Sequence, residues 1–189
     1  MLMKDKILDA ALTLVAREGW TDLSFQEIAN LAEVPLAEVY EHFPQKSAFL
    51  LALNEKVDRF VLKQAEELSE ESGITPRERL FDLSLTRLDA LFPYKNALAH
   101  IYKDLWFDPL SVLTLAPGFM TSLEWMLQAS GLGISDCYGK VRIKALGTIY
   151  FLSLKTWLED DSEDTSKTMA FMDTQMTRAE SLFPQIWKG

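Results

Sequence analysis

The sequence predicts an all-α protein, and two observations carry this prediction. Apolar residues recur at helical spacing along most of the chain, first at Ile7, Leu8, Ala11, Leu12, Val15 and Ala16. These apolar runs are punctuated by Pro and Gly, and no alternating apolar and polar stretch is long enough for a β-sheet. With 189 residues and 48% hydrophobic side chains, the chain can bury a sizeable core. We expect about nine helices.

Three short helices are expected near the N-terminus. The first carries the apolar stripe above and ends at Gly19. Ser24 and Glu27 have the spacing of a capping box at the start of the second helix. Pro35 suits the first position of the third helix, where its missing N–H is no loss. Two short helices around a tight turn have the layout of a helix-turn-helix DNA-binding motif.

Three longer runs in this region share a pattern with known regulators, namely ILDAALTLVAREGW, LSFQEIANLAEVP and VYEHFPQKSAFLLAL. In the last run Tyr40 and Phe43 precede a short turn, and Lys46 begins a long helix. On these runs the chain resembles the TetR family of one-component transcriptional regulators. The resemblance implies a TetR-like fold, with a helix-turn-helix domain over residues 1–46 and a helical ligand-binding and dimerisation domain over residues 47–189.

The same resemblance implies a function. The expected protein is a regulator that binds operator DNA as a dimer, responds to a small apolar ligand and works in the cytoplasm. The residues that it places at the DNA are Ser24, Pro35, Leu36, Glu38, Tyr40, His42 and Lys46.

The charge of this domain departs from the usual pattern. Residues 1–50 hold four basic and eight acidic side chains, a net charge of −4, and the whole chain has −9. Glu33 stands in the turn where the family commonly has Gly, and Glu38 and Glu41 lie on the expected reading helix. Neutralisation of phosphates supplies most non-specific affinity for DNA, so these acidic residues weaken the expected grip.

The rest of the chain is predicted to form longer helices. One begins near Ser47 and runs to about residue 70, and Thr75 and Glu78 form a capping box for the next. Pro93 and Pro109 open two further helices. The last two helices are a nearly all-apolar helix over residues 136–159 and one with a narrow apolar seam of Met169, Met172, Met176, Ala179 and Phe183.

The last two helices resemble the TetR-family dimer interface, a four-helix bundle made by two subunits. We therefore expect a homodimer through them. The alternative is that both apolar stripes pack within one subunit.

The middle helices are rich in aromatic residues, a composition that suits an apolar pocket with a polar group at His100. The alternative is an ordinary core in which these side chains fill volume. The expected ligand-binding residues are Phe81, Leu88, Phe92, His100, Tyr102, Trp106, Phe119, Trp125 and Tyr150.

The C-terminal half carries a second resemblance. The runs LFPYKNALAHIYKDLW and YFLSLKTWLEDDSEDTSKTMAFMD are similar to the ubiquinone-biosynthesis accessory proteins, which have a TetR-like fold and bind lipid instead of DNA. This resemblance implies an alternative function, a lipid-binding accessory protein that has lost DNA binding.

Catalysis has little support in the sequence. His42 and His100 are the only histidines, and no spacing of His, Cys and carboxylates suggests a metal site. We expect neither an enzyme nor a cofactor. Cys137 is the single cysteine and fits a reducing compartment. The uncharged run Pro109–Leu123 is too short for a membrane span, so none is expected.

Overall fold

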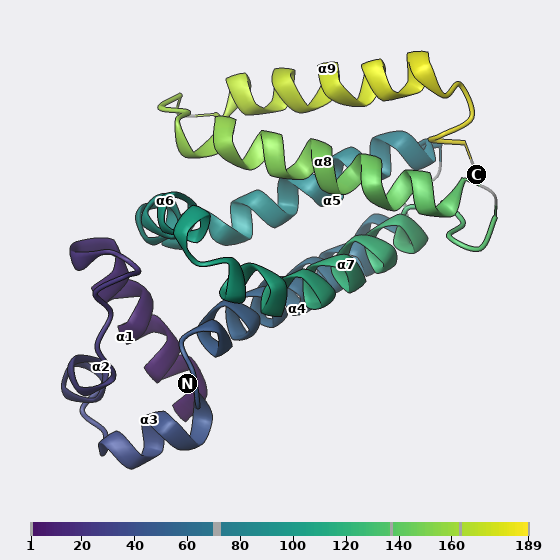
Figure 1. Cartoon of the computed structure of the whole chain (residues 1–189). Helices are drawn as coiled ribbons and strands as arrows, with labels where there is room; N and C mark the ends of the chain where they lie inside the picture. Colours follow the sequence, from purple (N-terminus) through teal and green to yellow (C-terminus); the bar gives the residue numbers. More distant parts are fainter. Residues whose placement is uncertain (1, 70–72, 137, 163, 189) are drawn as a thin grey trace. The chain divides into compact units, whose positions relative to one another are not determined.

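The computed structural model describes residues 2–69, 73–136, 138–162 and 164–188, and all regular structure in these ranges is helical (Figure 1). Cys137 lies outside the described residues. The elements are α1 (Met3–Glu18), α2 (Phe25–Leu31), α3 (Leu36–His42), α4 (Ser47–Ser69), α5 (Pro76–Leu91), the 3-10 turn η1 (Phe92–Tyr94), α6 (Lys95–Asp104), the 3-10 turn η2 (Leu105–Phe107), α7 (Pro109–Ala129), α8 (Gly139–Leu158) and α9 (Ser166–Leu182). The predicted all-α class is confirmed for the residues that the structure describes.

These elements form two compact units, and α4, α7 and, through Leu91, α5 contribute residues to both. The first unit comprises residues 1–56 and 91–118, and the second comprises residues 57–90 and 119–189. The functional division into a DNA-binding domain over residues 1–46 and a ligand-binding domain over residues 47–189 stays a prediction.

The first unit is built around the apolar face of α1, which packs against α2 and α6. Ile7 and Val15 on this face are fully buried, as the stripe in the sequence predicts. The helix ends at Gly19, whose φ of 95° lies in the region that favours glycine. Asp9 of α1 accepts a hydrogen bond from Tyr94 Oη of η1 at 3.0 Å, and Lys56 Nζ of α4 donates to both. This polar bridge fixes η1 and α4 to α1.

Of the two capping boxes predicted from the sequence, the one at α5 is confirmed and the one at α2 is wrong. The capping box of α5 is confirmed, because Thr75 N donates to Glu78 Oε2 at 2.8 Å and Glu78 N to Thr75 Oγ1 at 3.3 Å. The capping box expected at α2 is wrong: Ser24 is the N-cap residue, but its side chain makes no capping bond. Pro35 is the N-cap of α3, one position before the first helical residue.

In the second unit α8 and α9 lie side by side, and the described C-terminal residues pack against them (Figure 1). Arg142 of α8, 2% exposed, donates from Nε to the carbonyl of Ile186 at 2.6 Å and from Nη2 to that of Lys188 at 2.7 Å. Its Nη1 reaches Asp136 Oδ2 at 2.6 Å. A buried guanidinium is tolerated here because carbonyls and a carboxylate satisfy its donors.

By length and composition alone, α7 is long and apolar enough to cross a membrane, with a mean hydropathy of 1.2 over its most apolar stretch. Core helices of soluble proteins can have the same length and composition, but such helices are mostly buried. In α7 only 28% of this stretch is buried. Several of the exposed apolar side chains lie on η2 and the first turns of α7, namely Phe107, Leu110, Val112 and Leu113.

The turn between α8 and α9 depends on Asp160, which is 3% exposed. Its Oδ2 accepts from Thr168 N at 2.9 Å and Thr168 Oγ1 at 2.7 Å, and its Oδ1 accepts from Ser162 N at 3.0 Å. Burial alone would raise the pKa of the Asp160 carboxyl, but the hydrogen bonds from Ser162 and Thr168 outweigh it and lower the pKa well below its usual range.

We predict that Asp160→Asn lowers the free energy of unfolding by about 2 kcal/mol at neutral pH, because charge-assisted hydrogen bonds to a buried carboxylate are lost. Urea denaturation measures this change, with Asp161→Asn, an exposed neighbour, as the matched control.

The folded-state pKa of Asp160 lies below the unfolded value, so its stabilisation is fully present above about pH 4. It is lost as the pH falls through the folded-state pKa. The difference in stability between wild type and Asp160→Asn should therefore shrink below about pH 4. A difference that is constant from pH 7 to pH 3 would contradict this account.

Candidate DNA-binding and ligand-binding sites

The helices α2 and α3 form the candidate DNA-binding motif. The turn between them places Glu33 at φ 52°, a left-handed conformation that a non-Gly residue adopts at some cost. The Val34 N–H donates to the carbonyl of Ala29 at 3.0 Å and closes the turn. Fully buried Val39 and Phe43 anchor α3 to the first unit, and Phe43 stacks on Phe49 of α4 with ring centroids 4.2 Å apart. These contacts fix which face of α3 points outward.

The outward face of α3 is acidic. Ala37 and Glu41 are exposed and Glu38 is partly exposed, and together we call them the outward ridge. Glu38 Oε2 lies 3.8 Å from His42 Nε2 on the same helix. Tyr40, beside the ridge, is 52% exposed, and its ring packs on Phe25 with centroids 4.9 Å apart. The chain has no Lys or Arg between Arg17 and Lys46, so α2 and α3 carry no permanent positive charge.

The predicted DNA-binding residues lie around this surface. Pro35 is exposed, and Ser24, Leu36 and His42 are partly exposed. Their role at DNA stays a prediction.

Lys46 is the most constrained of the predicted residues. Its Nζ donates to the carbonyl of Trp20 at 3.0 Å and to that of Thr21 at 2.8 Å, and it lies 5.7 Å from the centroid of the Trp20 ring. Two of its three ammonium hydrogens therefore hold the connection between α1 and α2. At most one remains for a phosphate.

Two carboxylates bind the N–H groups of the same connection, and neither contact was predicted from the sequence. Asp104 Oδ2 of α6 accepts from the N–H groups of Trp20 at 3.0 Å and Thr21 at 3.2 Å. Asp108 Oδ2 accepts from Trp20 Nε1 at 3.3 Å. Hydrogen bonds from Ser111 and Trp20 lower the pKa of the Asp108 carboxyl. They outweigh the effect of burial, which by itself would raise this pKa. These partners are more than 80 residues apart in sequence, and no local pattern signals their pairing.

The predicted ligand-binding residues fall in both units. Phe92, His100 and Tyr102 belong to the first unit, where Phe92 is 60% exposed. The described residues do not include the side chain of Trp106. In the second unit the structure brings Phe119 and Tyr150 together, with ring centroids 5.7 Å apart. The remaining residues of this unit are the buried Leu88 and the partly buried Phe81 and Trp125.

Arg87 lies against the Phe119–Tyr150 pair and was not predicted from the sequence. It is 3% exposed, pairs with Asp58 of α4 and lies 5.9 Å from the centroids of both rings. Ser122 Oγ donates to Asp58 Oδ2 at 2.6 Å, so the buried charges are compensated. Burial raises the pKa of Tyr150 to about 12, and the nearby Arg87 guanidinium works against that rise.

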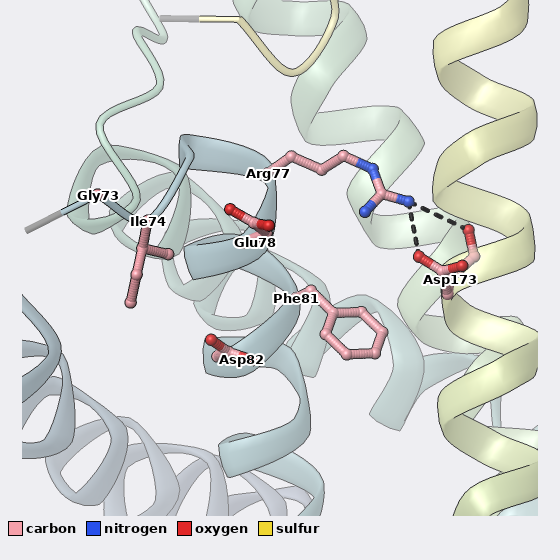
Figure 2. Close-up of a pocket in the computed structure, with 7 residues that line it drawn as sticks. All are labelled: Gly73, Ile74, Arg77, Glu78, Phe81, Asp82 and Asp173. Atoms are coloured by element: carbon pink, nitrogen blue, oxygen red, sulfur yellow. Dashed lines mark hydrogen bonds and ion pairs between the residues drawn. The ribbon is translucent and has the colours of Figure 1, made fainter. Parts of the chain in front are cut away.

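A surface hollow of about 480 Å³ lies between α5 and α9 (Figure 2). Of the predicted ligand-binding residues, only Phe81 is among those that line it in the described part of the chain. Arg77 reaches across to α9, where its Nη2 pairs with Asp173 Oδ1 at 2.7 Å (Figure 2). The same nitrogen donates to Thr177 Oγ1 at 2.9 Å. The remaining lining residues are Gly73, Ile74, Glu78 and Asp82.

A metal centre finds no support among the residues that the structure describes. They contain no group of three or more His, Cys, Asp or Glu side chains that could hold an ion.

Comparisons with known proteins agree with the geometry of the first three helices. Residues 7–53 match the family of bacterial regulatory proteins described as the tetR family. No protein of curated function matches the chain in sequence.

Solved structures match almost the whole chain. A TetR transcriptional regulator from Nitrosomonas europaea ATCC 19718 is 24% identical with a TM-score of 0.74, over 95% of this chain and 98% of that one. The regulator FadR from Bacillus subtilis, solved in complex with stearoyl-CoA, is 19% identical with a TM-score of 0.62, over 93% and 96%. The fatty acid degradation regulator FadR from Bacillus halodurans is 19% identical with a TM-score of 0.66, over 93% of each chain. All three of these proteins are described as regulators.

Residues 7–53 therefore match the tetR family of bacterial regulatory proteins, and the chain as a whole has the fold of the solved TetR transcriptional regulator from Nitrosomonas europaea.

Proposed function

We propose that the protein is a cytoplasmic TetR-type transcriptional regulator that binds operator DNA as a homodimer and responds to a small apolar ligand. The observation that carries the proposal is α3, which is anchored by buried Val39 and Phe43 and exposes its opposite face. A helix presented in this way fits the major groove. A ligand would act by favouring one of two spacings of the two reading helices.

The acidic surface makes this a regulator with few phosphate contacts. Lys46 keeps at most one free N–H, and Tyr40, which is 52% exposed, is the other candidate donor to a phosphate. Most of the affinity then has to come from contacts in the groove and from the second half-site, since phosphate neutralisation is weak.

A homodimer through α8 and α9 is part of the proposal. Met172 and Met176 are fully buried within the protomer, so this part of the apolar seam packs inside one subunit. Phe151 and Leu152 of α8 and Met169 of α9 stay exposed, at 45%, 42% and 39%. Exposed apolar side chains on neighbouring helices favour burial against a second copy.

A second candidate is the lipid-binding accessory protein that has lost DNA binding. The absence of Lys and Arg between Arg17 and Lys46 favours it, as do the exposed apolar side chains of Phe107, Leu110 and Leu113. The two candidates differ in one respect that can be measured, retention of DNA at low salt.

We predict that the dimer binds genomic DNA fragments at low salt. The logarithm of the association constant should fall with the logarithm of the salt concentration with a slope of about −4, which corresponds to about two phosphate contacts per subunit. Tyr40→Phe should weaken binding about five-fold, since it removes one hydrogen bond and keeps the ring. Fluorescence anisotropy measures both, with Tyr138→Phe in the second unit as control. No binding at low salt would favour the lipid-binding candidate.

We predict that Leu152→Asp raises the dimer dissociation constant roughly 30-fold or more, because it places a charge in an apolar interface. Leu62→Asp on α4 is the matched control, because Leu62 has the same 42% exposure and lies on neither α8 nor α9. Sedimentation velocity over a concentration series gives both constants. Equal constants for the two variants would place the interface elsewhere.

We predict that the second unit binds a long-chain acyl probe, for which stearoyl-CoA and stearate are suitable choices, and that Phe119→Ala weakens it about ten-fold through lost apolar contact. Phe60→Ala on α4 is the control, since Phe60 is 49% exposed. Native mass spectrometry and quenching of tryptophan fluorescence report binding, and circular dichroism checks folding. Unchanged affinity in Phe119→Ala would remove Phe119 from the site.

A further inference from the structure

We infer that α3 reads cytosine through the carboxylate of Glu41, and that the operator half-site presents a cytosine to this residue with a thymine methyl group near Ala37. The inference rests on the proposed binding of DNA and names the kind of base sequence that the same surface recognises. It predicts which base of a G·C pair the protein contacts, namely the cytosine.

The geometry of α3 selects the residues. Val39 and Phe43 are fully buried and define the inner face of the helix. Ala37 and Glu41 lie four residues apart on the opposite, exposed face, so that their side chains are neighbours one turn apart. They stand at the centre of the outward ridge, and Tyr40 lies at its edge.

Glu41 is the side chain of the ridge that can accept a new hydrogen bond. No described residue holds it by a hydrogen bond or an ion pair. Glu38 instead lies 3.8 Å from His42 Nε2, which pairs with it when the imidazole is protonated. A base contact therefore costs Glu41 no existing interaction in the protein.

The chemistry of the major groove then decides which base this carboxylate accepts. An ionised carboxylate has acceptors only. Cytosine presents its N4 amino group as a donor, whereas guanine presents N7 and O6 as acceptors. Adenine offers an N6 donor beside the N7 acceptor, and thymine offers O4 and a methyl group. Cytosine is favoured and guanine is repelled.

The rest of the surface agrees with this assignment. The commonest base contact is Arg or Lys to guanine, and residues 18–45 contain neither. The methyl group of Ala37 has no polar requirement and suits the thymine methyl. The ring of Tyr40 packs on Phe25 and steadies the exposed edge of α3, 4.9 Å between centroids.

The experiment is selection of random double-stranded DNA at low salt with the full-length protein, followed by sequencing of the retained molecules. Wild type should enrich a motif with a cytosine at one position of each half-site, and exchange of that pair to guanine should weaken binding roughly ten-fold or more. Glu41→Arg should enrich guanine at the same position, because Arg donates to guanine O6 and N7.

Glu27→Gln is the matched control. It removes one exposed acidic charge from α2, so it should raise affinity for all sequences and leave the selected motif unchanged. If Glu41→Arg and wild type enrich the same bases at every position, Glu41 reads no base and the inference is wrong while the proposed function stands. If folded wild-type protein enriches no sequence, the proposed DNA binding fails and the inference falls with it.

Discussion

The connection between α1 and α2 is the constraint on which the first unit depends. Its two peptide groups at Trp20 and Thr21 are bound on both sides by charged side chains, with Lys46 on the carbonyls and Asp104 on the N–H groups. Charge-assisted hydrogen bonds of this kind are stronger than neutral ones. They tie α1, the start of α4 and the end of α6 to one short segment, and α2 and α3 follow directly from that segment in the chain.

This arrangement changes the role of Lys46. In the sequence it is the only Lys or Arg near the expected reading helix, and a phosphate contact is the natural interpretation. In the structure its ammonium group first satisfies two backbone carbonyls. The proposed DNA-binding surface therefore combines an acidic outward ridge with few cations. In the proposed function, base contacts supply most of the binding free energy, because few cations are present to neutralise phosphates.

Much of the fold follows from local sequence signals. Apolar periodicity predicted the helices, Thr75 and Glu78 form the expected capping box, and Glu33 takes the left-handed turn position. The α2 capping box failed because Ser24 sits at the N-cap without bonding through its side chain. Capping geometry depends on rotamers that a spacing rule does not fix.

The candidate sites were less predictable for a physical reason. The pairs Arg87–Asp58 and Trp20–Asp104 join residues 29 and 84 positions apart, and such pairs are set by packing and not by periodicity. The aromatic residues of the middle helices suggested one pocket. The structure brings Phe119 and Tyr150 together around Arg87, and Phe81 lines a separate hollow. Composition can indicate an apolar region, but it does not show which side chains meet.

The central claim is that this helix-turn-helix fold still recognises DNA in spite of its charge. DNase footprinting of the protein on retained genomic fragments at low salt tests it most directly. The account predicts two protected half-sites related by a two-fold axis, with centres separated by about one helical turn of DNA or a multiple of it. Uniform protection without a repeated half-site, or no protection at all, would contradict it.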